Sequence, residues 1–119
     1  MGKTVFYYIR GSGNEPVITI CLEQQNNHFL RGISICSAQD SPCKEMGRAW
    51  AERRVLRAER ISQKSQAFKK DYINFDSEKI TQSMDKFGWD ETRLPFDHKT
   101  YCIPLEELTD FERRLLVQS

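Results

Sequence analysis

Residues Arg31–Arg54 read RGISICSAQDSPCKEMGRAWAERR and join a predicted strand to a predicted helix. The β-branched run that ends near Cys36 is typical of a strand, and the polar residues that follow are typical of a turn. Ser41 is a good N-cap, and Pro42 suits the first helical position, where its missing N–H has no cost. The segment therefore predicts a strand that leads through a tight turn into an arginine-rich helix.

Two more predicted strands precede this segment. TVFYYIR at Thr4–Arg10 is rich in β-branched and aromatic residues. PVITICLEQ at Pro16–Gln24 alternates so that one face can be buried while the other faces solvent. The third strand spans Phe29–Ser37, and short connections between consecutive strands favour antiparallel neighbours. We therefore expect a three-stranded antiparallel meander.

The predicted helix runs from Pro42 to about Lys64, with Lys70 as its outer limit. At 100° per residue, one broad apolar face contains Met46, Trp50, Ala51, Ala58, Ile61 and Phe68, with Val55 at its edge. A sheet with an apolar face needs a helix to cover it, and Gly47 lets this helix approach closely. The fold class is therefore α+β, a three-stranded antiparallel sheet covered by a long helix.

Residues 71–119 predict a smaller helical C-terminal part. Asp76 or Ser77 caps a helix that Gly88 is placed to end. A short strand is expected near Lys99–Ile103. The stretch LEELTDFERRLL at 105–116 predicts one last helix, although its TDFE run at Thr109–Glu112 can instead be a capping box that starts a new helix after a turn.

The composition indicates one globular domain. The chain has 119 residues, of which 39% are hydrophobic and 29% charged, with a mean hydropathy of −0.64. No apolar run approaches the roughly 18 residues that span a bilayer, and the N-terminus lacks a secretory leader pattern, so a cytoplasmic protein is expected. The four cysteines are then expected to be free thiols.

Charge is distributed unevenly along the chain. Residues 43–70 carry a net charge of +6, residues 71–119 carry −5, and the first 42 residues balance. Such asymmetry indicates either a contact between two parts of one domain or two surfaces with different partners. The sequence leaves both open.

Catalytic motifs are missing from the sequence. It has no phosphate-binding glycine loop, nucleophile elbow or HExxH motif, so no enzymatic activity and no cofactor are expected. Cys43 near a helix N-terminus is the one thiol with an argument for reactivity, but packing beneath the third strand is the favoured alternative. His98 and Cys102 make at most half a metal site, so no metal is expected.

An arginine- and lysine-rich stripe on the long helix suggests nucleic-acid binding as the alternative function. The candidate phosphate contacts are Arg48, Arg53, Arg57, Arg60 and Lys64. Interleaved glutamates point instead to a solvated helix that is supported by ion pairs.

A partner-binding surface is suggested by aromatic residues in polar or alternating surroundings. Rings beside charged residues are typical of interface anchors, and a neighbouring acidic surface suits a basic partner. The candidate partner-binding residues are Tyr7, Trp89, Asp90, Glu91 and Phe96.

The opening segment also resembles a pattern found in small phage and prophage accessory proteins of unassigned role, over about residues 30–57. The matching residues are Gly32, Cys36, Ser37, Asp40, Lys44, Gly47, Arg48, Ala51 and Arg54. The resemblance implies a protein that binds and inhibits or redirects a host protein complex, such as a CRISPR or restriction defence system, in the host cytoplasm.

The same pattern has a structural interpretation. Arg54 is charged yet aimed along the apolar face of the helix. If Arg54 is buried against a carboxylate such as Asp40, or bonds a carbonyl at a strand end, the segment is a joint, that is, a structural connection between strand and helix. If Arg54 is exposed with its neighbours, the helix is also a binding surface. The joint is the favoured interpretation.

Overall fold

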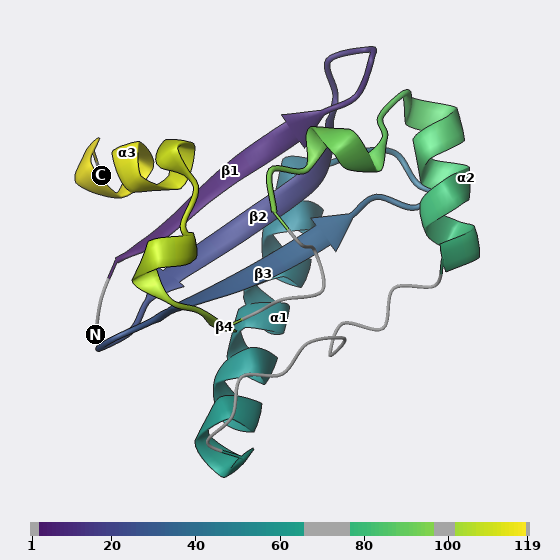
Figure 1. The fold of residues 1–119 in the computed structure, drawn as a ribbon. Helices are drawn as coiled ribbons and strands as arrows, with labels where there is room; N and C mark the ends of the chain where they lie inside the picture. Colours follow the sequence, from purple (N-terminus) through teal and green to yellow (C-terminus); the bar gives the residue numbers. More distant parts are fainter. Residues whose placement is uncertain (1–2, 66–76, 97–101, 119) are drawn as a thin grey trace.

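The computed structural model describes residues 3–65, 77–96 and 102–118 (Figure 1). Its strands are β1 (Thr4–Arg10), β2 (Pro16–Gln24), β3 (Phe29–Ile35) and β4 (Cys102–Ile103), and its helices are α1 (Lys44–Ser65), α2 (Ser77–Phe87) and α3 (Asp110–Gln118), with short 3-10 turns η1 (Glu91–Arg93) and η2 (Leu105–Glu107). The strands form one antiparallel sheet in the order β1-β2-β3-β4. The predicted α+β class is confirmed, and β4 adds a short fourth strand to the expected meander.

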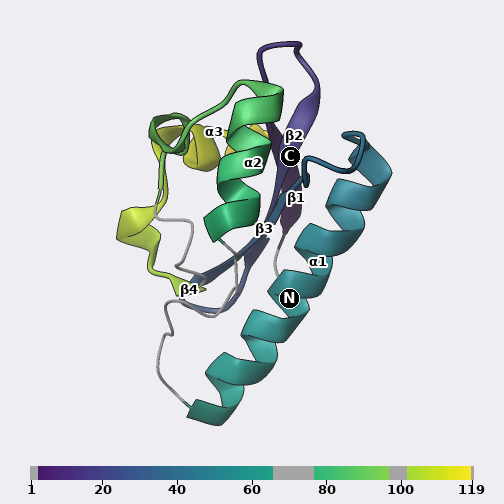
Figure 2. The same ribbon diagram turned by 90° about the vertical axis from the view of Figure 1, so that its right-hand side faces the viewer.

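Both faces of the sheet are covered. Figure 2 shows α1 on one face and α2 and α3 on the other. In β2 every residue from Val17 to Leu22 is buried, so the expectation that one face of this strand meets solvent is wrong. The reason is that the C-terminal part, whose place on the sheet the sequence left open, packs against the face that α1 does not cover.

Small side chains bring α1 close to the sheet. Ala51, Val55 and Ala58 are buried against Cys21 and Leu30. A Cβ atom added at Gly32 would overlap the Ala51 carbonyl oxygen, and one added at Gly47 would overlap the Thr19 hydroxyl. The expected role of Gly47 in close helix packing is therefore confirmed.

The predicted apolar face of α1 needs a correction. Met46 is 58% exposed and Trp50 is 45% exposed, so neither belongs to the buried face. Ala51 and Ala58 are buried as predicted, and Val55, predicted at the edge of the face, is buried with them. A helix this close to the sheet has no room beneath it for a tryptophan ring. The side chains of Ile61 and Phe68 lie outside the described residues.

The start of α1 also differs from the prediction. The helix begins at Lys44, and the Gly47 N–H donates to the Cys43 carbonyl at 2.9 Å. Cys43 therefore lies at the N-cap position, two residues after the predicted Ser41. The end of the helix at Ser65 matches the prediction of about Lys64.

The second face of the sheet carries the larger apolar core. Ile18, Ile20 and Ile33 pack there with Phe87 and Trp89. The α2 helix ends as predicted, since Gly88 has a φ of +73° and its N–H donates to the Met84 carbonyl at 2.9 Å. Asp76, one of the two predicted caps, lies outside the described residues.

A capping box starts α3. The Thr109 N–H donates to Glu112 Oε1 at 3.1 Å, and the Glu112 N–H donates to Thr109 Oγ1 at 3.1 Å. The alternative that the sequence offered for this stretch is thus confirmed: a turn over Leu105–Glu107 separates α3 from what precedes it.

The same glutamate anchors α3 to the sheet through a buried ion pair. Arg31 donates to Glu112 from Nη2 at 2.6 Å and from Nε at 3.0 Å, and the Tyr7 hydroxyl donates to Glu112 Oε2 at 2.7 Å. The centre of the Phe96 ring lies 4.1 Å from the guanidinium carbon of Arg31. Because Glu112 also accepts the Thr109 bond, both of its carboxylate oxygens are fully used.

The network changes the acidity of its members. Burial alone raises the pKa of the Glu112 carboxyl, but the hydrogen bonds and charge of Arg31, with the bonds from Tyr7 and Thr109, outweigh it and hold the pKa below its ordinary value. Burial, and then the negative charge of Glu112, raise the pKa of the Tyr7 hydroxyl far above its ordinary value. The ionised carboxylate and the neutral phenol are therefore the stable forms.

None of the described helices is both long enough and apolar enough to span a bilayer.

Candidate partner-binding surface

The two flanks of α1 carry different side chains. Residues three and four apart are neighbours on a helix. We call the side of α1 away from β1 its outer flank. By this spacing it consists of Met46, Trp50, Arg53, Arg57 and Arg60, all of them exposed.

The acidic residues of α1 lie on the opposite flank. Glu45, Glu52 and Glu59 recur every seven residues and so share one side of the helix. Burial raises the pKa of Glu23 on β2, and the charges of Glu59 and Glu52 raise it further, as is expected when these two glutamates lie near Glu23. Arg53, Arg57 and Arg60 therefore lie on a different side of the helix from Glu45, Glu52 and Glu59.

Trp50 is the largest side chain on the outer flank, and two guanidinium groups lie against its ring. The guanidinium carbon of Arg53 is 5.0 Å from the ring centre and that of Arg54 is 5.8 Å away. Such cation–π contacts favour one orientation of the ring. Trp50 is therefore a half-exposed aromatic side chain whose ring orientation is fixed by its neighbours.

Arg54 links this surface to the sheet. Its Nη1 donates to the Ile33 carbonyl at 2.6 Å, and the side chain is partly buried. The favoured interpretation of the segment as a joint agrees with this bond to β3, although the acceptor is a strand carbonyl and not Asp40. The contact with Trp50 makes the same arginine part of the exposed surface.

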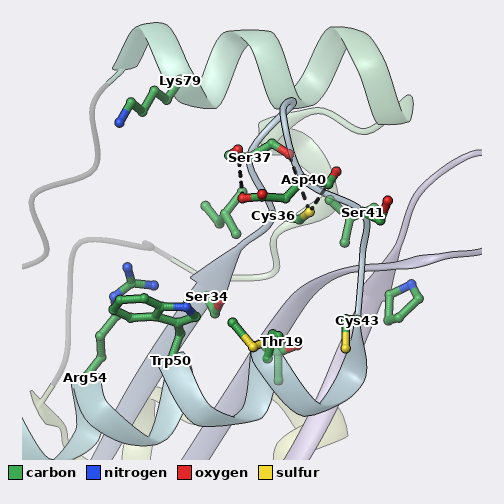
Figure 3. A pocket seen from close by; sticks show the side chains of 15 residues that line it. Thr19, Ser34, Cys36, Ser37, Asp40, Ser41, Cys43, Trp50, Arg54 and Lys79 are labelled. Atoms are coloured by element: carbon green, nitrogen blue, oxygen red, sulfur yellow. Dashed lines mark hydrogen bonds between the residues drawn. The ribbon is translucent and has the colours of Figure 1, made fainter.

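A pocket opens beside Trp50. It has a volume of about 490 Å³ and lies between the first turns of α1, the end of β3 with the loop that follows it, and α2, which contributes Lys79 (Figure 3). Met46, Trp50 and Cys36 are among the residues that line it. The pocket and the outer flank therefore form one continuous surface.

The loop that forms one wall of the pocket is held by its own hydrogen bonds. The Ser37 hydroxyl donates to Asp40 Oδ2 at 3.2 Å, and the Gln39 N–H donates to Ser37 Oγ at 3.2 Å. The Cys36 thiol points to the carbonyls of Ser37 and Asp40 at 3.5 and 3.7 Å. These bonds preform the wall without a ligand.

The chemistry of the pocket suits binding. Burial, followed by the charge of Asp40, raises the pKa of the Cys36 thiol, which disfavours the nucleophilic thiolate. Cys43 is an exposed free thiol at the rim. Within the described ranges 3–65, 77–96 and 102–118, no histidine lines the pocket to activate either sulfur. The pocket offers apolar, hydroxyl and cationic groups for recognition.

The other two cysteines, Cys21 and Cys102, lie in the interior. Burial, with smaller contributions from Glu52 and Glu23, raises the pKa of Cys21 to about 12. Cys102 is also buried. Within the part of the chain that the structure describes, no three His, Cys, Asp or Glu side chains are grouped to hold a metal, and His98 lies outside it.

The predicted partner-binding residues do not form one surface. Tyr7 is 7% exposed and bonded to Glu112, and Trp89 is 4% exposed, with its ring N–H donating to Ser83 Oγ at 3.1 Å. The prediction that these two side chains contact a partner needs correction, because the second face of the sheet is covered and each ring has a polar partner inside. Phe96 is partly buried over Arg31, whereas Asp90 and Glu91 are exposed.

The five residues predicted to contact phosphates are divided. Arg53, Arg57 and Arg60 lie together on the outer flank. Arg48 does not lie with them but contacts β1. Its Nε donates to the Tyr8 hydroxyl at 2.6 Å, and its guanidinium carbon lies 5.2 Å from the Phe6 ring centre. The side chain of Lys64 lies outside the described residues.

Sequence reasoning missed Met46 and Trp50 because their spacing resembles that of a buried face. The signal that could have revealed them is the small size of the sheet residues beneath the helix.

Comparisons of this chain with protein-family models, with curated proteins and with solved structures find no match.

Proposed function

We propose that this chain is a non-enzymatic accessory protein of phage type that binds a host protein complex and inhibits or redirects it, in the host cytoplasm. The observation that carries the proposal is the outer flank of α1, where Trp50 and Met46 stay exposed next to arginines and a preformed pocket. Tryptophan, methionine and arginine are enriched in protein interfaces, and tryptophan and arginine dominate their binding energy.

The two tryptophans support this reading by their contrast. Trp89 is 4% exposed, so the fold can bury an indole ring where packing requires it. Trp50 is 45% exposed in a helix whose opposite side is tightly packed. An exposed ring forgoes part of the burial energy of a large apolar side chain, which binding to a partner recovers.

Nucleic acid is the second candidate ligand, because three arginines beside an exposed indole ring also suit phosphates and stacked bases. Protein is favoured because Met46 and the pocket add apolar surface, which phosphates do not use. In addition, Glu45, Glu52 and Glu59 lie on the same helix, and the whole chain carries a net charge of only +1.

The Trp50→Ala variant tests the proposal. We expect it to weaken binding of the host complex by about 30-fold, equivalent to roughly 2 kcal/mol, because the anchor ring is lost. The tagged protein is used to capture host proteins, the captured complex is purified, and its affinity and activity are measured with and without the protein. Leu56→Ala is the matched control, because Leu56 is 50% exposed on the flank with the glutamates.

The proposal requires three results together: specific capture by the wild type, capture that Leu56→Ala keeps and Trp50→Ala reduces, and altered activity of the captured complex. Both variants should keep the wild-type melting temperature within a few degrees. Equal capture by all three proteins, or a captured complex whose activity does not change, contradicts it.

A further inference from the structure

We infer that the outer flank of α1 and its pocket recognise an acidic segment of a partner protein, which places one apolar side chain in the pocket and alternating carboxylates along the arginines. This inference rests on the proposed function, because it gives the chemistry of the partner that the same surface binds.

The pocket has the properties of a side-chain site. Its volume of about 490 Å³ falls within the range of about 300–1,000 Å³ that is typical of ligand pockets. Trp50 and Met46 supply apolar surface, while Thr19 and Ser34 supply hydroxyl groups at its base (Figure 3). Because the bonded Ser37–Asp40 loop and the stacked Trp50 ring are already ordered, little conformational entropy is lost on binding.

Charge complementarity identifies the rest of the segment. From the pocket, Arg53, Arg57 and Arg60 follow one another along α1, while the glutamates of the helix lie on its other flank. Arg54 and Lys79 add positive charge at the pocket itself, where Asp40 is the one acidic residue among the described residues of the lining. A segment with carboxylates on the side that faces the helix therefore fits, and a basic segment is repelled.

The spacing of the arginines suits an extended chain. With a rise of 1.5 Å per residue, Arg53, Arg57 and Arg60 lie about 6 and about 4.5 Å apart along the helix axis. Side chains on one face of an extended strand lie about 7 Å apart, within reach of flexible arginines. The whole flank from Met46 to Arg60 measures about 21 Å, the length of six or seven extended residues.

The test uses a fluorescein-labelled heptapeptide in which one phenylalanine is followed by three glutamates at alternate positions, with threonines between them. Two matched peptides replace the phenylalanine by glycine or all the glutamates by glutamine. A labelled single strand of twelve deoxythymidines serves as the nucleic-acid probe. Fluorescence anisotropy measures the Kd of each probe with the full chain at low and at high salt.

We expect the acidic phenylalanine peptide to bind with a Kd of about 10–100 μM, as a short segment of a larger interface. Each matched peptide should bind at least tenfold more weakly, and added salt should weaken the acidic peptide. Trp50→Ala and the double variant Arg53→Glu/Arg60→Glu should each lose at least tenfold in affinity. The control double variant Arg93→Glu/Arg114→Glu makes the same charge change at exposed residues away from α1 and should change the Kd by less than twofold.

Several results would overturn the inference. Equal binding of the glycine peptide removes the role of the pocket, and equal binding of the glutamine peptide removes the role of the arginines. Tighter binding of the deoxythymidine strand makes nucleic acid the ligand. Concentration-dependent dimers in sedimentation equilibrium that Arg53→Glu/Arg60→Glu abolishes make a second copy of the chain the occupant.

The inference and the proposed function can fail separately. If no peptide binds but host capture still depends on Trp50, the partner is not acidic and the proposed function stands. If the acidic peptide binds as expected but no host complex is captured or changed in activity, the surface is correctly described and the proposed function is wrong.

Discussion

The Glu112→Gln variant is expected to lose about 3–5 kcal/mol of its free energy of unfolding, because it leaves the Arg31 guanidinium charged and buried without its counter-ion. Both side chains are almost completely buried, at 2% and 0% exposure. A loss of this size lowers the melting temperature by on the order of 10–20 °C in a domain of this length. Urea denaturation followed by circular dichroism measures the free energy directly.

A double variant separates the stability of the pair from the cost of breaking it. Arg31→Met/Glu112→Leu removes both charges together and should be much less destabilised than Glu112→Gln, because no unpaired charge remains. Glu107→Gln is the surface control, expected within about 0.5 kcal/mol of the wild type, since Glu107 is exposed. If Glu112→Gln is as stable as this control, the ion pair does not hold α3 to the sheet.

The ion pair also predicts acid sensitivity. The pKa of Glu112 is lowered in the folded state, so its stabilisation is complete above the ordinary pKa of 4.5 and is lost as the pH falls below that value toward the folded-state pKa. Between pH 7 and pH 3 the wild type should therefore lose more stability than Glu112→Gln, which has no carboxyl at this position. Free energies of unfolding of both proteins across this range test the prediction, and parallel pH profiles would contradict it.

The Gly32→Ala variant is expected to lose about 3 kcal/mol or more, because a methyl group at this position meets backbone atoms of α1, which cannot move aside as the end of a long side chain can. Besides overlapping the Ala51 carbonyl oxygen, the added Cβ would lie 2.8 Å from Val55 Cγ2 and 2.9 Å from the Val55 nitrogen. The helix can relieve this overlap only by moving away from β3, which opens the packing of α1 on the sheet. Thermal and urea denaturation measure the loss.

Gly13→Ala is the matched control for this prediction. A Cβ at Gly13 would meet only the end of the Glu15 side chain, the nearest atom being Oε2 at 2.7 Å, and that end can move. We therefore expect a change of about 0.5 kcal/mol or less. A Gly32→Ala variant as stable as this control would mean that α1 does not rest on the sheet as closely as described.

Local patterns in the sequence were enough to predict most of the secondary structure. Alternation and short loops predicted the three long strands, and Gly88 predicted the end of α2. The capping box at Thr109–Glu112 offered the start of α3 as an alternative to one helix over 105–116. Each of these signals acts between residues close in the sequence, through backbone bonds and preferred dihedral angles. Their consequences can therefore be worked out one segment at a time.

The rotation of α1 about its own axis needed the sheet. Periodicity alone predicted Trp50 and Ala51 on the same apolar face of the helix. Which of the two is buried depends on the strand register, which aligns Thr19, Cys21 and Gly32 beneath the helix. That row is too small to accommodate an indole ring, so the alanines face inward and Trp50 faces solvent. The candidate binding surface follows from this choice.

What the sequence by itself determined is thus the list of elements, their caps and the charge of each part of the chain. What only the tertiary structure decided is which side chains meet across long separations. Arg31 and Glu112 are 81 residues apart, and Lys79 reaches the pocket beside Trp50 from a different helix. Such long-range contacts depend on the packing of two layers against one sheet. This packing is set by how the side chains of distant segments fit together, which no short pattern along the chain contains.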